Sequence, residues 1–494
     1  MTSSQSPNGR PAASAPVAAL FSSVVPGWGQ AYTGDDRGAY RFFVIDLILL
    51  FSLLLVLARF QLEAVKAWVS PDALLAIMAV NIGLLIYRTL AVAGAYRRGS
   101  ASAVGVGGAV TLFGAMALLV VPHLVFGYLT WTQYDLIDSV FAPSSPVAAG
   151  ATTLPPASGA GSITTTVPAT TTTTLPPRIW DGLERLNIAL LGSDMRPDQE
   201  DLDPGDPRYR GHRTDVMIVV SINPAPPYDV ALFSVPRFLS NYQMPEGMGV
   251  EPTLDEWDWI GHVWRRADDV APEAYPGPGT PGENGVKAAL GELFGIPIHH
   301  YALITVGGFI DVIDALGGVT IDVPRRIVDR NYDTADNHAA ATRTTIVIEE
   351  GTQDLNGFQA LAYARIRSQS HEFARMQRQR CVIAALVEQT NPVSLLRNFG
   401  AVAEAIKSNV LTDIPQDALA DFVELLPNLD TENFTTLNIA QNAYEIPAPV
   451  SGIRYYDLDQ IRADAQFLMR DPEAARQALG LSGLDTTCED TLDP

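Results

Sequence analysis

Three long apolar runs in the first third of the chain limit its fold more than any other feature. They cover about Tyr40–Phe60, Ala73–Tyr96 and Val104–Trp131. Each run can cross ~30 Å of hydrocarbon as a helix rising ~1.5 Å per residue, whereas a signal peptide has one short apolar core. The sequence therefore predicts a multi-span α-helical membrane region over residues 1–141.

Arginines beside these runs predict the orientation of the chain. Arg37 and Arg41 precede the first run, and Arg97 and Arg98 separate the second from the third. Because cytoplasmic loops are enriched in basic residues, we expect the amino terminus inside and everything after Trp131 outside. This predicts a multi-pass protein of the cytoplasmic membrane with an extracytoplasmic carboxy-terminal domain.

A shorter apolar stretch, Val17–Val25, runs into PGWGQAYTG at Pro26–Gly34. That sequence resembles the PGxGQxYxG turn of small multi-span bacterial membrane proteins. The stretch is too short to span a membrane, so we favour an interfacial or re-entrant element over a fourth span.

Composition separates the membrane region from an acidic outer part. Residues 142–178 contain no acidic residue and consist largely of Thr, Pro, Ala and Gly, which predicts a disordered linker. Beyond Arg178 the chain has 24 basic and 48 acidic residues, a formal charge of −24. This charge argues against nucleic-acid binding, which requires a broad basic face.

The outer part alternates short apolar runs with helical periods. Strands are predicted at Leu186–Asp194, Thr214–Asn223, Asp229–Arg237 and Val319–Pro324, and helices at Gly282–Ile296 and Gly307–Gly318. This order predicts an α/β fold with a mixed sheet covered by helices. We assign residues 179–450 to this domain and residues 451–494 to a carboxy-terminal helical extension.

Five arginines lie within Leu361–Arg380 of this acidic domain. Alternation across Tyr363–Arg367 predicts a strand end that presents Arg365 and Arg367 on one face. Arg375, Arg378 and Gln379 then share one helical face, and Arg380 follows. The planar donor fork of arginine suits a phosphate, so the set could bind a polyanion, although a surface salt-bridge network would have the same pattern.

Six ordered motifs across Leu186–Gln389 are similar to those of the LytR-CpsA-Psr family. They are GSDMR (Gly192–Arg196), RTDVMIVVSINP (Arg213–Pro224), SVPR (Ser234–Arg237), DALGGVTIDVP (Asp314–Pro324), LNGFQALAYARIR (Leu355–Arg367) and RMQRQR (Arg375–Arg380). The resemblance implies an αβα sandwich with a mixed central sheet and an apolar tunnel for a polyprenyl chain. It also implies transfer of a glycopolymer from a polyprenyl-pyrophosphate carrier to peptidoglycan at the outer face of the cytoplasmic membrane.

The same resemblance implies roles for nine residues. Two aspartates would hold Mg²⁺ or Mn²⁺, three arginines would contact the pyrophosphate, and two further residues would close the site. In that order they are Asp194 and Asp215; Arg237, Arg365 and Arg367; Arg375 and Gln379. Arg196 and Arg213 are weaker substrate-binding candidates that could instead orient a neighbouring aspartate. The aspartates themselves could instead be helix or loop caps.

The sequence departs from the family at two positions. Phe238 stands where the family usually has Asp, and Glu372 stands where Asp is common. Loss of the first carboxylate could free Arg237 or remove a contact that positions it.

Several apolar residues have two interpretations, as lining of the lipid path or as ordinary core. They are Leu290, Leu293, Phe294, Phe309, Ile310, Ile313 and Leu316, with Trp257, Trp259 and Trp264 at a lipid entrance.

Cys381 and Cys488 lack metal-ligand spacing, and whether they pair as a disulfide stays open.

Three functions fit these residues. The first is a metal-dependent transferase that uses no enzyme nucleophile, because charge neutralisation and an in-line acceptor hydroxyl suffice. The second is a hydrolase in which water replaces the glycan hydroxyl. The third is a non-catalytic polyprenyl-lipid-binding or regulatory protein, which the Phe238 departure keeps open.

Overall fold

The computed structural model describes residues 13–59, 66–99, 105–143, 178–195, 213–249, 259–333, 343–366, 372–389, 392–439, 443–448 and 453–483. The chain divides into two compact units, Met1–Asp138 and Ser139–Pro494. The predicted linker therefore lies almost wholly outside the described residues.

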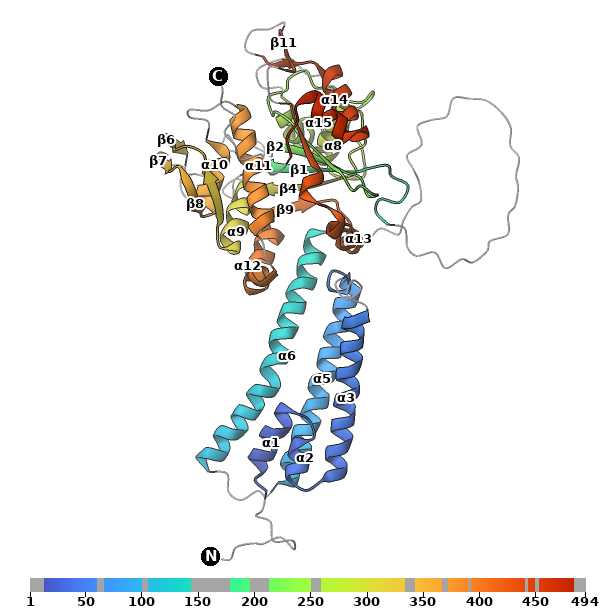
Figure 1. The fold of residues 1–494 in the computed structure, drawn as a ribbon, viewed down its shortest axis with the longest axis vertical. Helices are drawn as coiled ribbons and strands as arrows, with labels where there is room; N and C mark the ends of the chain where they lie inside the picture. The colour runs from blue at the N-terminus through green and yellow to red at the C-terminus, as the bar shows by residue number, and fades with distance from the viewer. Residues whose placement is uncertain are drawn as a thin grey trace, which may run out of the picture. The chain divides into compact units, whose positions relative to one another are not determined.

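The first unit contains three helices that are long and apolar enough to cross a membrane, as predicted (Figure 1). They are α3 (Asp36–Arg59), α5 (Pro71–Arg98) and α6 (Val106–Val140). Two shorter helices precede them, α1 (Ala15–Val24) and α2 (Trp28–Tyr32). With ten residues, α1 is too short to span, as expected for a re-entrant or interfacial element.

The PGWGQ turn docks these short helices on α5. Gln30 is fully buried; its Nε2 donates to the carbonyl of Ala91 at 2.7 Å, and its Oε1 accepts from the hydroxyl of Ser22 at 2.8 Å. Gly27 has a φ of 100°, a conformation that favours glycine. The motif thus joins α1 and α2 to α5 through buried hydrogen bonds.

The second unit is built on a six-stranded mixed sheet of order β10-β3-β2-β1-β4-β9. β1 is antiparallel to β2 and parallel to β4, while β3 is antiparallel to β2 and parallel to β10. The strands are β1 (Leu186–Ser193), β2 (Thr214–Ile222), β3 (Val230–Ser234), β4 (His300–Thr305), β9 (Val410–Thr412) and β10 (Phe434–Asn438). The predicted strands at β1, β2 and β3 are confirmed.

Helices cover both faces of this sheet, so the predicted αβα sandwich is confirmed (Figure 1). One face packs on α7 (Val263–Asp269), α8 (Pro281–Phe294), α14 (Leu458–Arg470) and α15 (Pro472–Leu479). The other faces α9 (Val306–Leu316), α10 (Gly357–Arg365), α11 (Glu372–Gln389) and α13 (Ala418–Leu425), while α12 (Pro392–Asn409) packs on α9. Alternate residues of β1 supply the two cores: Ala189 and Leu191 face α8, whereas Ile188 and Leu190 face α11.

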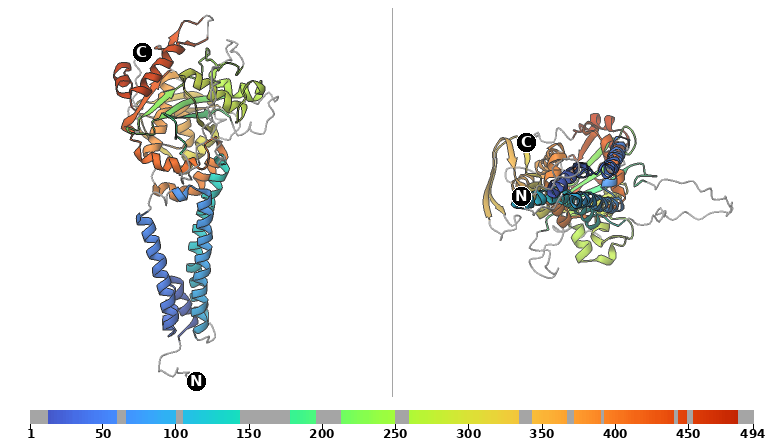
Figure 2. Two further views of the ribbon diagram at one scale, coloured as in Figure 1. Left: turned by 90° about the vertical axis from the view of Figure 1, so that its right-hand side faces the viewer. Right: turned by 90° about the horizontal axis from the view of Figure 1, so that it is seen from below.

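Two antiparallel pairs add a smaller core around α10 and α11. β5 (Val319–Val323) pairs with β8 (Gly351–Leu355), and β6 (Ile327–Asp333) pairs with β7 (Arg343–Ile348). The β6–β7 hairpin lies at the margin of the unit in the right-hand view of Figure 2. Two short strands, β11 (Glu445–Ile446) and β12 (Tyr455–Tyr456), form a further pair.

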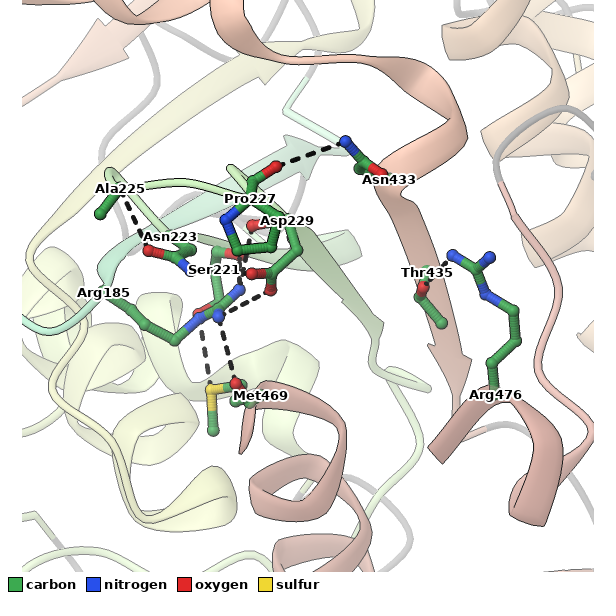
Figure 3. Close-up of polar contacts among 10 residues, drawn as sticks. All are labelled: Arg185, Ser221, Asn223, Ala225, Pro227, Asp229, Asn433, Thr435, Met469 and Arg476. Atoms are coloured by element: carbon green, nitrogen blue, oxygen red, sulfur yellow. Dashed lines mark hydrogen bonds and ion pairs between the residues drawn. The ribbon is translucent and has the colours of Figure 1, made fainter. Parts of the chain in front are cut away.

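A mostly buried arginine connects elements at the end of the sheet where β1 begins (Figure 3). Arg185 pairs with the carboxylate of Asp229 at 2.8 Å and donates to the hydroxyl of Ser221 at 2.8 Å. It also donates to the carbonyls of Ser221, Asp229 and Met469. One side chain therefore ties β1, β2 and β3 to α14, with protein acceptors for its donors.

Candidate functional site

An apolar cavity of about 330 Å³ lies between the sheet and α9, α10 and α11. Its apolar lining includes Leu190, Ile218, Ala302, Ile304, Phe309, Leu361 and Ile383. Its polar lining comes from the ends of β1 and β4, from the start of β2, and from helices α10 and α11. The polar residues are Ser193, Asp194, Asp215, Thr305, Arg365, Arg375 and Gln379. The cavity thus combines an apolar interior with a charged mouth at one end of the sheet.

The exposure of β4 reflects this cavity. β4 has strand neighbours on both sides, yet its residues alternate between half-buried and buried. The half-buried Ala302 and Ile304 line the cavity, whereas Tyr301 belongs to the opposite core; Leu303 is part of that core and also borders the cavity. Sequence reasoning missed these cavity residues, because alternation in a strand gives its two faces but not which face borders a void.

The assignment of lipid-path residues is settled in part. Phe309 lines the cavity. Leu290, Leu293 and Phe294 of α8 do not, because they belong to the core on the other face of the sheet. Ile310 and Ile313 lie in smaller clusters behind α9, so ordinary packing accounts for them.

The two predicted metal ligands meet at the mouth of the cavity. Asp194 follows the end of β1, and Asp215 is the second residue of β2. The register passes from Gly192–Val216 to Ser193–Thr214, so Asp215 is the extra residue of a β-bulge. A bulge re-aims a side chain, and Asp215 lines the cavity at this bulge.

Asp194 is held buried beside a second carboxylate. It is 5% exposed and forms an ion pair with Arg213, yet its Oδ1 has no hydrogen-bond partner. Burial raises the pKa of Asp194, the charge of Asp215 raises it further, and Arg213 opposes both effects. This carboxylate therefore gains from any further cation at the mouth.

Arg237 lies beside Asp215, the second carboxylate of the mouth. Its guanidinium pairs with the Asp215 carboxylate and lies 4.5 Å from the ring centroid of Phe238, while its Nε has no partner. Phe238 in turn packs edge-on against Trp259, with ring centroids 4.4 Å apart. The residue that departs from the family thus covers one side of the guanidinium with an aromatic ring.

The prediction of a strand end at Tyr363–Arg367 is wrong, because helix α10 runs to Arg365. Asn356 and Gln359 form a capping box that starts this helix, and local alternation could not reveal a helix set by its cap. Arg365 still lines the cavity, from the last turn of α10.

The RMQRQR motif on α11 serves two purposes. Arg375 and Gln379 line the cavity, and Arg375 also donates to the backbone carbonyl of Asp215 at 3.3 Å. Arg378 instead donates to the carbonyls of Tyr363 and Ile366 at the end of α10. The expectation that Arg378 shares the binding face is therefore wrong: it caps the unpaired carbonyls of a neighbouring helix.

Other predicted residues cannot be placed at the mouth. Arg196, Arg367 and Trp257 lie outside the described residues. Trp264 is a core residue, whereas Trp259 is half-buried near Arg237. Cys381 is buried and disulfide-bonded; Cys488, the other cysteine of the chain, lies outside the described residues.

Comparison with known proteins gives consistent matches to this unit. The model of the LytR_cpsA_psr family matches residues 163–468. A "Polyisoprenyl-teichoic acid--peptidoglycan teichoic acid transferase TagU" of Bacillus mycoides is 28% identical over 296 residues, covering 60% of this chain and 76% of that protein. Its namesake in Oceanobacillus iheyensis is 30% identical over 280 residues, covering 55% and 71%.

Solved structures are also similar. The crystal structure of B. subtilis TagV covers 58% of this chain and 98% of that one, at 21% identity and a TM-score of 0.41. A structure titled "TagT bound to LIIa-WTA" covers 60% and 92%, at 19% identity and a TM-score of 0.37.

Proposed function

Because the chain belongs to the LytR-CpsA-Psr family, we propose that it transfers a glycopolymer from a polyprenyl-pyrophosphate carrier to peptidoglycan. One observation carries the proposal: an apolar cavity opens at a mouth lined by arginines. A polyprenyl chain suits the apolar interior, and a pyrophosphate suits the guanidinium groups at the mouth.

The residues of the mouth fit transfer without an enzyme nucleophile. The acceptor hydroxyl attacks the sugar-side phosphorus, the bond to the lipid phosphate breaks, and the hydroxyl proton is released. Arg365 and Arg375 neutralise the charge that develops on the lipid phosphate, with Arg237 beside them. Gln379 lies on the same face of α11 as Arg375 and helps to orient the headgroup.

A divalent cation, Mg²⁺ or Mn²⁺, belongs to this proposal. Asp194 and Asp215 supply hard oxygen ligands, and the partnerless Oδ1 of Asp194 is available to a cation. Among the described residues there is no cluster of three or more His, Cys, Asp or Glu that could hold a metal, so substrate phosphate oxygens would complete the coordination. The cation would supply positive charge beside the pyrophosphate.

The proposed orientation completes the assignment. The arginines at the start of α3 and at the end of α5 favour a cytoplasmic amino terminus, and the catalytic unit would then lie outside, where the carrier lipid and peptidoglycan meet. A cysteine placed at Ser100 is expected to resist an impermeant reagent added from outside. Labelling of intact cells at that position would contradict the orientation.

The full chain in detergent tests the activity, with a short-chain polyprenyl-pyrophosphate glycan as donor. We expect glycan-phosphate product only when peptidoglycan and a divalent cation are both present. Release of polyprenyl phosphate without peptidoglycan would support the hydrolase instead. Binding without turnover would support the non-catalytic protein.

A further inference from the structure

Arg380 is a buried arginine whose positive charge is not balanced by a carboxylate among the described residues. It is 4% exposed; its Nη1 donates to the hydroxyl of Ser234 at 3.3 Å, and its Nε has no partner. No described carboxylate forms an ion pair with it. Burial lowers the pKa of Arg380 to about 10, so the group remains charged at neutral pH.

An isolated buried cation is costly to the folded state. Proteins normally place a carboxylate beside such a group, as Asp229 stands beside Arg185. When the protein supplies no counter-ion, a bound anion can supply it, and the affinity for that anion increases in return. The relevant question is therefore which anion binds near Arg380.

The position of Arg380 links it to the mouth of the cavity. Ser234, its partner, ends β3 and begins the segment that carries Arg237. Gln379, its neighbour on α11, lines the cavity. Arg380 itself does not line the cavity and is buried, so its charge is separated from solvent between the cavity-lining helix α11 and the end of β3.

We propose that Arg380 is a positioning residue that holds an unneutralised charge behind Arg237 and strengthens binding of the pyrophosphate headgroup without touching it. The inference rests on the proposed function. Because the charge is shielded from solvent, added salt screens it weakly. Because the protein leaves it uncompensated, the folded state without ligand is less stable than it would be with an apolar residue there.

Three variants of the full-length protein in detergent test this role. The probe is geranylgeranyl pyrophosphate, and both its affinity and the melting temperature without ligand are measured. Arg380→Met is expected to weaken the affinity by roughly 10-fold, because a buried charge acts on a nearby anion through an effective dielectric constant of about 20 rather than that of water. Its melting temperature is expected to equal or exceed that of the wild type, and the weakening is expected to persist at high salt. Arg380→Lys retains the charge and is expected to restore most of the affinity.

Arg185→Met is the control, because Arg185 is a mostly buried arginine with protein acceptors at the other end of the sheet. It is expected to lower the melting temperature and leave the affinity unchanged. A lower melting temperature with unchanged affinity in Arg380→Met, or failure of that variant to fold, would make Arg380 structural and overturn the inference. Failure of the wild type to bind the probe would instead reject the proposed function.

Discussion

Both ends of the central sheet carry arginines and aspartates, but the two ends differ in how many protein partners these side chains have. At the end where β1 begins, Arg185 has a carboxylate, a hydroxyl and three carbonyls as acceptors (Figure 3). At the end where β1 finishes, Arg237 and Arg380 each retain a partnerless Nε. The eight residues of β1 separate these ends by about 25 Å at ~3.3 Å per residue.

The aspartates at the two ends show the same contrast. Asp413 follows β9 and accepts from the Lys287 ammonium at 2.6 Å and from the Tyr301 N–H at 2.7 Å. Although burial alone would raise the pKa of Asp413, the His300 ring 3.5 Å away and these two bonds lower it. Burial and a neighbouring carboxylate raise the pKa of Asp194 instead. One end therefore favours the ionised carboxylate, whereas at the other end ionisation of Asp194 is disfavoured despite its pairing with Arg213.

The largest effect is expected from breaking the compensated end. Arg185→Ala leaves Asp229 buried without its cation and removes the link from β1 to α14. The loss in free energy of unfolding should be about 3–5 kcal/mol. Denaturant unfolding of the variant measures it. A loss below about 1 kcal/mol would show that the network is dispensable.

At the mouth, Arg365→Ala should reduce turnover by about 10²-fold or more, because it removes a donor aimed at developing charge. Arg365→Lys should rescue poorly, since lysine lacks the bidentate fork. Steady-state kinetics with donor and acceptor, together with melting temperatures close to the wild-type value, check this. Full activity in the lysine variant would reduce the role of Arg365 to that of a simple positive charge.

The paired carboxylates should control cation affinity. We expect Asp194→Asn to weaken Mg²⁺ affinity by ~10–100-fold while Asp413→Asn leaves it unchanged. Protons compete with the cation, and the pKa of Asp194 is raised. Affinity should therefore decline on acidification at a higher pH than for an ordinary aspartate. Calorimetric Mg²⁺ titrations at several pH values test both expectations, and equal losses in the two variants would contradict the assignment.

The smallest effect is the pH dependence that Asp413 gives to stability. Because its folded-state pKa is lowered, its contribution is present above the unfolded pKa and is lost as pH falls through the folded value. Asp413→Asn should cost about 1 kcal/mol at neutral pH and less in acid. Unfolding at pH 7 and pH 3 measures this. A penalty that grows in acid would mean that the carboxylate is not stabilised by its donors.

Some features follow from the sequence because they depend on local order along the chain. The three long apolar runs became α3, α5 and α6, and the continuous apolar runs at Leu186, Thr214 and Asp229 became central strands. The family motifs also brought Asp194, Asp215, Arg365, Arg375 and Gln379 to one cavity. Period and composition suffice for the apolar runs, since burial of such a run requires only that it have a partner; the cavity residues were expected from the family resemblance.

The tertiary structure decided what depends on neighbours distant in sequence. A bulge opposite Gly192 turned Asp215 into the cavity, and a capping box made Tyr363–Arg365 helical. Packing of α11 then gave two arginines of one motif different partners among the described residues: carbonyls for Arg378, and a single hydroxyl for Arg380. The sequence determined how many charges this helix carries. Which of them the protein itself neutralises depends on the surrounding acceptors, and only folding brings those together.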